Sequence, residues 1–261
     1  MADPFGADLL VVGAHPDDLE LHFGGIAARA AADGLSVVGL DLTRGERATR
    51  GNPETRAAEA LAAAKVLGLA ERLNAGLPDT SVHSGDDAQV RAVVSIVRRV
   101  RPRWVLLPHP EDAHPDHREG GRLLERALYF AHVGGYLAEG ARHRVLGHLY
   151  DWPEAGSRAG GMRAHGAGFV IDVSASFETK RRALECYVSQ FTANKEADAG
   201  AGATRLTRPT FLGSVEAKAR RLGELVGVEF GEGLVQAGAL LWREPLGGLF
   251  GARGLGGGPT A

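Results

Sequence analysis

Cysteine is nearly absent from this chain, which has one such residue, Cys186, in 261 positions. A single cysteine cannot form a disulfide within the chain, and it cannot supply the cysteine-rich ligand set of a typical structural zinc site. Sparse cysteine is typical of a reducing compartment, so we expect a cytoplasmic protein. The first residues also lack the basic and apolar regions of a secretory signal.

Long apolar runs and an excess of positive charge are also absent. No run approaches the roughly 18–20 apolar residues that a membrane-spanning helix requires. The chain has 30 Lys and Arg against 32 Asp and Glu, a formal net charge of −2, whereas nucleic-acid-binding proteins usually carry a basic excess or stripe. The densest basic cluster, residues 97–103, is typical of a solvated helix end. We therefore expect neither nucleic acid nor a membrane as a partner.

The sequence does contain an alternation of short apolar segments and longer segments with helical periodicity. In the first half the expected strands are 9–13, 36–40, 72–74 and 104–107, and the expected helices are 26–32, 54–67, 86–100 and 120–131. This order predicts an α/β fold, a three-layer sandwich in which helices cover both faces of a mainly parallel sheet. In the less regular second half, the expected strands are 145–150 and 169–173, and the expected helices are 177–187 and 215–226.

Glycine positions and local composition predict the boundaries of these segments. The Gly24-Gly25 pair predicts a turn before the first helix. We interpret residues 193–203, which are small and polar, as a mobile loop that could act as a lid. No repeat or linker divides the chain, so we expect one domain over residues 1–246. The glycine-rich residues 247–261 are typical of a disordered tail.

Two histidine-containing segments each follow an expected strand. His15–Asp18 (His-Pro-Asp-Asp) comes after the first strand, and His114–His117 (His-Pro-Asp-His) comes after the strand at 104–107. A lone His-Pro-Asp usually marks a turn, because proline fixes φ and aspartate binds nearby amides. Two such segments at two strand ends instead favour one divided active site, since α/β sheets bind ligands beyond the carboxyl ends of their strands.

His15, Asp18 and His117 are the candidate metal ligands. His15 and Asp18 lie three residues apart after one strand, and His117 lies beyond the end of a second. Two imidazoles and one carboxylate leave one position open on a tetrahedral zinc ion, which is the pattern of a catalytic site. Iron(II) accepts the same donors, so the pattern leaves Zn²⁺ and Fe²⁺ both open.

Asp17, His114 and Asp116 are the candidate catalytic residues. A carboxylate beside the metal, here Asp17, can accept a proton from a metal-bound water, whose pKa zinc lowers to about 7. We expect His114 on the same loop as His117, where it can donate to a leaving nitrogen or stabilise an oxyanion. Asp116 can hold the His114 imidazole in the required tautomer. The combination predicts a metal-assisted hydrolase of an amide or ester.

The remaining histidines are interpreted as surface or packing residues. They are His22, His83, His109, His132, His143, His148 and His165.

These motifs resemble those of the LmbE-like (PIG-L) family of zinc-dependent N-acetylglucosamine deacetylases, which share paired Ala-His-Pro-Asp-Asp and His-Pro-Asp-His sequences. The resemblance covers about residues 8–246 and is closest to the bacillithiol biosynthesis deacetylases. The other supporting stretches are Gly13–Glu20, Asp41–Glu46, Pro53–Arg56, Glu111–His117 and Tyr187–Phe191.

The resemblance implies a Rossmann-like fold and a homo-oligomer, and it implies a role for each motif residue. Zinc would bind His15, Asp18 and His117, with Asp17 as general base and His114 as general acid. The implied reaction removes the N-acetyl group from an N-acetylglucosamine conjugate. In the bacillithiol subgroup this small-molecule substrate is N-acetylglucosaminyl malate.

Two further positions follow from the resemblance. Arg56 matches a family arginine near the site and could bind a substrate carboxylate or sugar hydroxyls, although a helix-surface arginine is the alternative. Some relatives have a tyrosine in a late loop that polarises the scissile carbonyl, and Phe211, which has no hydroxyl, is its apparent counterpart here.

Two alternatives to this deacetylase remain open. An amidase acting on a thiol conjugate would use the same zinc site and differ only in its pocket. A catalytically idle sugar- or nucleotide-binding module would use the same sheet. The first strand is not followed by a Gly-x-Gly-x-x-Gly sequence, which disfavours the nucleotide binder.

Overall fold

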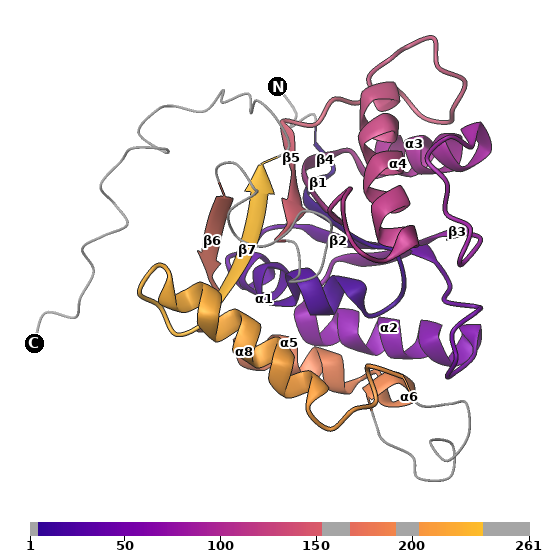
Figure 1. The fold of residues 1–261 in the computed structure, drawn as a ribbon. Coiled ribbons are helices and arrows are strands. Elements are labelled where there is room, and N and C mark those ends of the chain that lie inside the picture. The colour runs from indigo at the N-terminus through magenta and orange to yellow at the C-terminus, as the bar shows by residue number, and fades with distance from the viewer. Residues whose placement is uncertain (1–4, 153–167, 192–203, 237–261) are drawn as a thin grey trace, which may run out of the picture.

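The computed structural model describes residues 5–152, 168–191 and 204–236, which form one twisted sheet with helices on both sides (Figure 1). The strands are β1 (Ala7–Gly13), β2 (Val37–Thr43), β3 (Glu71–Leu77), β4 (Pro102–Leu107), β5 (Gly147–Asp151), β6 (Gly168–Asp172) and β7 (Gly231–Gln236). The helices are α1 (Asp18–Ala32), α2 (Pro53–Leu67), α3 (Asp87–Val100), α4 (Pro115–Ala131), α5 (Phe177–Glu185), α6 (Val188–Phe191) and α8 (Phe211–Glu224).

The predicted α/β architecture is confirmed. The strand order is β3-β2-β1-β4-β5-β7-β6, and the five strands from β3 to β5 pair in parallel. The strand β7, which the sequence analysis did not predict, runs antiparallel to both β5 and β6. Its sequence Gly-Glu-Gly-Leu-Val-Gln is short and interrupted by glycine, so it lacks the apolar run by which the parallel strands were recognised.

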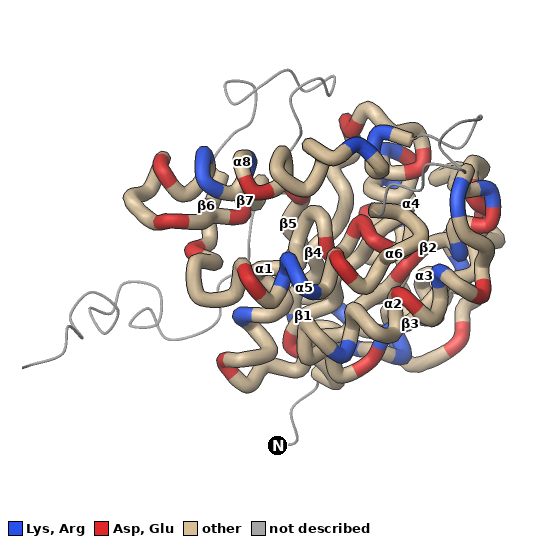
Figure 2. Tube along the Cα trace, turned by 90° about the horizontal axis from the view of Figure 1, so that it is seen from below, with Lys and Arg blue, Asp and Glu red and all other residues tan. Residues whose placement is uncertain are grey.

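The two faces of the sheet bury two separate apolar clusters, which explains why central strands such as β1 are mostly apolar. Successive side chains of a strand point to opposite faces. Accordingly, Leu10 and Val12 pack with α3 and α4, whereas Leu9 and Val11 pack on the other face with α1 and α2. Figure 1 shows α3 and α4 on one side of the sheet and α1, α2, α5 and α8 on the other. Figure 2 shows basic and acidic residues interspersed along the described chain.

The prediction of a turn at Gly24-Gly25 is wrong, because both glycines lie inside α1. Their role is close packing. A Cβ at Gly25 would lie 2.8 Å from the Cβ of Val173, and one at Gly24 would lie 3.0 Å from the Cγ of Lys180. Glycine at these positions therefore lets α1 lie close to α5 and to the segment that leads into it.

The sequence analysis expected the second motif to lie in a loop. In the structure most of this motif is helical. The helix α4 begins at Pro115, five residues before the expected start, with His114 as its N-cap residue. Proline suits the first turn of a helix because its missing N–H would have no partner there. His117 therefore lies in the first turn of α4. The predicted lid at 193–203 and the predicted tail at 247–261 lie outside the described residues. Among the residues that are described, no helix is long and apolar enough to cross a membrane.

Candidate active site

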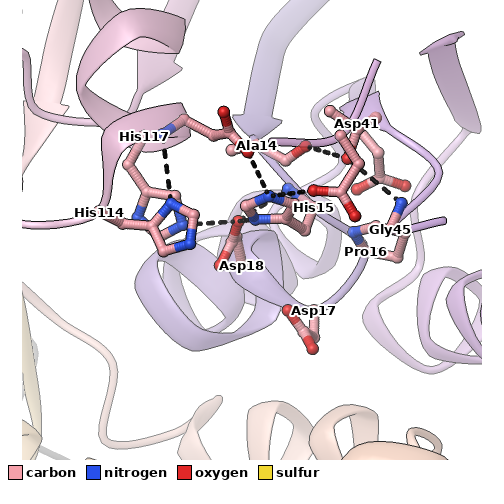
Figure 3. A network of polar contacts seen from close by, with 12 residues as sticks. Ala14, His15, Pro16, Asp17, Asp18, Asp41, Gly45, His114 and His117 are labelled. Atoms are coloured by element: carbon pink, nitrogen blue, oxygen red, sulfur yellow. Dashed lines mark hydrogen bonds and ion pairs between the residues drawn. The ribbon is translucent and has the colours of Figure 1, made fainter. Parts of the chain in front are cut away.

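Neighbouring parallel strands bring the two motifs together. The strands β1 and β4 pair side by side, so the loop after β1, which carries His15, lies beside the segment that leads from β4 into α4. The carboxyl ends of parallel strands share one edge of the sheet, which is why residues about 100 positions apart meet here. Figure 3 shows His15, Asp18, His114 and His117 gathered at this edge.

A single carboxylate oxygen links the three expected metal ligands. Asp18 Oδ2 lies 3.1 Å from His15 Nδ1 and 3.1 Å from His117 Nε2. Donor atoms on a common zinc ion, each about 2.0–2.1 Å from it, have separations of this order. Among the described residues, three triads have ligand atoms that all lie within 4.8 Å of one another: His15/His114/His117, Asp18/His22/His117 and His15/Asp79/Asp116. The expected set of His15, Asp18 and His117 is not itself one of these triads, but two of the triads each contain two of its members. The donors therefore suit a divalent ion, and they are more numerous than the sequence analysis expected.

The carboxylates of the site also stabilise positive charge on the imidazoles. Burial opposes protonation of His117, but Asp18 and Asp112 raise its pKa to about 10. Burial likewise opposes protonation of His15, whose pKa is nevertheless raised well above its usual range by hydrogen bonds to Asp116, Asp18 and Asp79. An electrostatic environment that favours two imidazolium ions also favours a metal dication in their place.

Asp17 is buried and held by Arg56. It has a positive φ of 109°, a strained conformation for a residue other than glycine, at the N-cap of α1. Arg56 Nη2 donates to Asp17 Oδ2 at 2.9 Å and also to the Pro16 carbonyl. Burial raises the pKa of Asp17 to about 7, against the lowering effect of Arg56. In Figure 3 the Asp17 side chain points away from the histidine cluster.

Arg56 is not the helix-surface arginine that the sequence left as an alternative. The residue is 4% exposed, although it lies on α2. It lines the same cavity as Asp17, and its Nε atom has no hydrogen-bond partner among the described residues.

The surroundings of His114 differ from the expectation in one respect. The backbone N–H of Asp116 donates to His114 Nδ1 at 3.2 Å, so the proton of the neutral ring lies on Nε2. The Asp116 carboxylate instead lies 3.2 Å from His15 Nε2 and accepts from the backbone amides of Thr80 and Val82. Asp116 therefore orients His114 through its main chain, while its carboxylate contacts a candidate metal ligand.

Burial and the nearby charge of His117 lower the pKa of His114. The two rings stack with centroids 4.6 Å apart. A lower pKa makes the protonated imidazole a stronger acid.

Three site residues were missed by the sequence analysis: His22, Asp79 and Asp112. Asp79 follows the carboxyl end of β3 and lies 3.3 Å from His15 Nε2. Asp112 Oδ1 lies 3.5 Å from His117 Nδ1. Both acidic residues could have been found by extending the search at each strand end by a few positions. His22 lies four residues after Asp18, and the mistaken turn at Gly24 concealed this helical spacing.

A cavity of about 680 Å³ opens over these residues. Its described lining adds Arg47, Arg205 and Gln190 to the site described above. Phe211, at the start of α8, also lines it and stacks on Phe191 with a centroid distance of 5.8 Å. The position of Phe211 is therefore that of a residue that can touch a ligand, and its ring offers no hydroxyl.

Comparison with known proteins places this arrangement in a family. The family model PIG-L, described as GlcNAc-PI de-N-acetylase, matches residues 10–128, a span that includes both motifs. A solved structure of a conserved protein from Thermus thermophilus is 34% identical, with a TM-score of 0.75 over 91% of this chain and 97% of that chain. The chain belongs to the PIG-L (LmbE-like) family.

Curated relatives in the PIG-L family are named as deacetylases. Diacetylchitobiose deacetylase of Thermococcus kodakarensis is 28% identical over 70% of each chain. The 1D-myo-inositol 2-acetamido-2-deoxy-alpha-D-glucopyranoside deacetylase of Rhodococcus opacus is 27% identical over 70% of this chain and 82% of its own length.

The fold alone does not determine the reaction. A 4-carboxy-2-hydroxymuconate hydratase from Pseudomonas putida, 20% identical, has the same fold with a TM-score of 0.70 over 92% of this chain and 99% of its own. The function must therefore be argued from the site.

Proposed function

We propose that this protein is a metal-dependent hydrolase that removes the N-acetyl group from an N-acetylglucosamine conjugate. The observation that carries the proposal is that Asp17, a buried carboxylate with a raised pKa, lines the same cavity as the cluster of metal-type donors around Asp18 Oδ2. The names of the family and its curated relatives support this reaction class.

The proposed ligands are His15, Asp18 and His117, and Zn²⁺ or Fe²⁺ suits them. A divalent ion held there supplies Lewis-acid polarisation of a carbonyl and lowers the pKa of a water molecule.

The proposed acid–base chemistry belongs to Asp17 and His114. Asp17 accepts a proton from the attacking water, which its pKa of about 7 suits. The water oxygen bonds to the acetyl carbon, the carbon–nitrogen bond breaks, and His114 supplies a proton to the departing amine. Asp116 positions the His114 ring through the backbone N–H that donates to Nδ1. The products are acetate and a free glucosamine conjugate.

As the specific substrate we propose N-acetylglucosaminyl malate, the precursor expected in bacillithiol biosynthesis. Malate carries two carboxylates, and three guanidinium groups line the cavity, from Arg47, Arg56 and Arg205. Guanidinium groups bind carboxylates through paired hydrogen bonds. Arg56 binds Asp17, and the proposed contacts for the malate are the other two arginines of the lining, Arg47 and Arg205, the latter with its Cζ 5.6 Å from the centroid of the Phe211 ring.

Acetate release from purified, metal-loaded protein tests the function. N-acetylglucosaminyl malate, its inositol analogue, diacetylchitobiose and an N-acylated thiol conjugate serve as parallel substrates. We expect the malate conjugate to have the highest kcat/KM. Faster turnover of the thiol conjugate would identify the amidase alternative, and absence of acetate from all four would refute the deacetylase. Tight nucleotide binding by the inactive protein would then support the binding module.

Variants test the assigned roles. Asp17→Asn is expected to retain the metal but lose at least about 100-fold in kcat, the range for loss of a general base. His15→Ala is expected to lose both metal and activity. Asp33→Asn, which alters an exposed residue at the end of α1, is the matched control and leaves both unchanged. Full activity in Asp17→Asn would refute its role as base.

The homo-oligomer and the cytoplasmic location remain predictions. Light scattering of the purified protein measures the first, and cell fractionation measures the second.

A further inference from the structure

His22 lies beside the metal centre, although neither motif includes it. It is four residues after Asp18 on α1, so both side chains project from the same face of the helix. The ligand atoms of Asp18, His22 and His117 all lie within 4.8 Å of one another. The His22 ring is 5.8 Å from the His117 ring and perpendicular to it, at 89°. His22 also lines the cavity of the candidate active site.

A buried carboxylate stands behind His22. Asp151, the last residue of β5, is 2% exposed, and its Oδ2 lies 2.9 Å from His22 Nδ1. Neither His22 Nδ1 nor Asp151 Oδ1 has a hydrogen-bond partner among the described residues, so the close contact between Nδ1 and Oδ2 is an ion-pair contact. Metal-ligating histidines commonly have a carboxylate against their second ring nitrogen, which fixes the tautomer and the ring orientation. With Nδ1 facing Asp151, Nε2 is the nitrogen available to a metal.

We propose that His22 is a fourth protein ligand of the metal centre and that Asp151 is its positioning residue. This inference rests on one part of the proposed function, the binding of a metal ion at Asp18. It adds a third imidazole to the expected set of His15, Asp18 and His117.

The extra ligand has a consequence for the choice of metal. Four protein ligands fill a tetrahedral zinc ion and leave no position for substrate, as in structural zinc sites. An ion that accepts five or six ligands, such as Fe²⁺ or Co²⁺, keeps open positions with the same four residues. The site is therefore expected to be most active with an ion of higher coordination number.

The alternative is that His22 and Asp151 form a structural ion pair without contact to the metal. Both interpretations predict that removal of His22 changes stability, so stability does not separate them. Metal affinity and metal coordination do, because only a ligand changes both.

Titration of metal-stripped protein with Co²⁺, followed by calorimetry and visible absorption, tests the proposal. We expect His22→Gln to raise the Kd for Co²⁺ by at least about 10–100-fold and to change the absorption spectrum, and Asp151→Asn to raise the Kd by about 10-fold or more. His83→Gln, which alters an exposed histidine outside the site, is the matched control and leaves both unchanged. A folded His22→Gln protein with the wild-type Kd and spectrum would overturn the proposal.

X-ray absorption of the wild-type and His22→Gln proteins, each with one equivalent of Zn²⁺, compares the number of imidazole ligands. Because His15, His114 and His117 also form a donor triad, three imidazoles in the wild type support the proposal only if the variant has two. Two imidazoles in the wild type, or three in both proteins, overturn it. Three imidazoles in a protein that releases no acetate would reject the deacetylase function and leave the ligand assignment intact. Two imidazoles in a protein that does release acetate would reject His22 as a ligand and leave the deacetylase function intact.

Discussion

A buried ion pair that contacts α1 provides the sharpest test of what stabilises the helix beside the active site. Lys180 Nζ lies 2.6 Å from Glu232 Oε1, and both side chains are 4% exposed. Glu232 also accepts from the backbone amides of Gly25 and Ile26 at 2.9 and 2.7 Å, while Lys180 donates to the Leu21 carbonyl at 2.8 Å. The pair therefore ties α5 and β7 to the middle of the helix whose N-terminus carries Asp17 and Asp18.

Removal of one member should be costly because it leaves the other charge buried and unpaired. We expect Lys180→Met or Glu232→Gln to lower the free energy of unfolding by about 3–5 kcal/mol. For a chain of this size each kcal/mol corresponds to about 2–4 °C, so the Tm should fall by roughly 6–20 °C. The double variant leaves neither charge unpaired, and its cost should be smaller than the sum of the single costs by about 1–3 kcal/mol.

Denaturant unfolding of the metal-stripped proteins, followed by circular dichroism, measures these terms. The metal must be absent because an ion bound to the folded state alone adds its own stabilisation. A loss below about 1 kcal/mol in Lys180→Met, or strictly additive losses in the double variant, would refute the argument that the unpaired charge carries the cost.

Three further outcomes follow from buried groups elsewhere. Burial lowers the pKa of His143, so the folded state favours the neutral imidazole, and stability should be lost as the pH falls below about 6.5. The difference in Tm between pH 8 and pH 5 should therefore be smaller in His143→Gln than in the wild-type protein. An equal pH dependence in that variant would contradict this assignment. Gly25→Ala should cost about 1–3 kcal/mol in urea unfolding, because its Cβ would lie 2.8 Å from Val173 Cβ and 3.0 Å from Glu232 Oε1; a neutral effect would mean that α1 shifts freely. Arg98 donates to six backbone carbonyls at the end of α4 and in the following loop, so Arg98→Met should cost at least about 3 kcal/mol in the same assay, and unchanged stability would show that water replaces those bonds.

The parallel half of the fold could be predicted because each of its central strands is buried on both faces. Segments such as Leu9–Gly13 are apolar at every position, and each is followed by a helix with clear periodicity. The antiparallel edge could not be predicted in the same way. The strand β7 contains two glycines and Glu232, whose buried charge is balanced by Lys180, a residue 52 positions earlier. A buried ion pair of this kind has no signature in either segment alone.

In the candidate site, too, the sequence could predict which segments meet but not which side chains contact each other. The paired motifs predicted that His15, Asp18 and His117 would meet, because parallel strands must end at one edge of the sheet. The sequence could not show that the Asp116 carboxylate contacts His15 rather than His114, since both partners lie within reach of the same first turn of α4.

His22 was missed for a different reason, which also indicates how it could have been found. Its spacing of four residues from Asp18 becomes informative only if the helix begins at Asp18, and the Gly24-Gly25 pair had been interpreted as a turn. Glycine in a helix interior usually weakens the helix, so it is a reasonable signal for a break. Here the neighbouring segments explain the exception, because a Cβ at Gly25 would lie 2.8 Å from Val173 and a Cβ at Gly24 would lie 3.0 Å from Lys180. A packing requirement far along the sequence thus explains why two glycines lie inside α1, the helix that carries both Asp18 and His22.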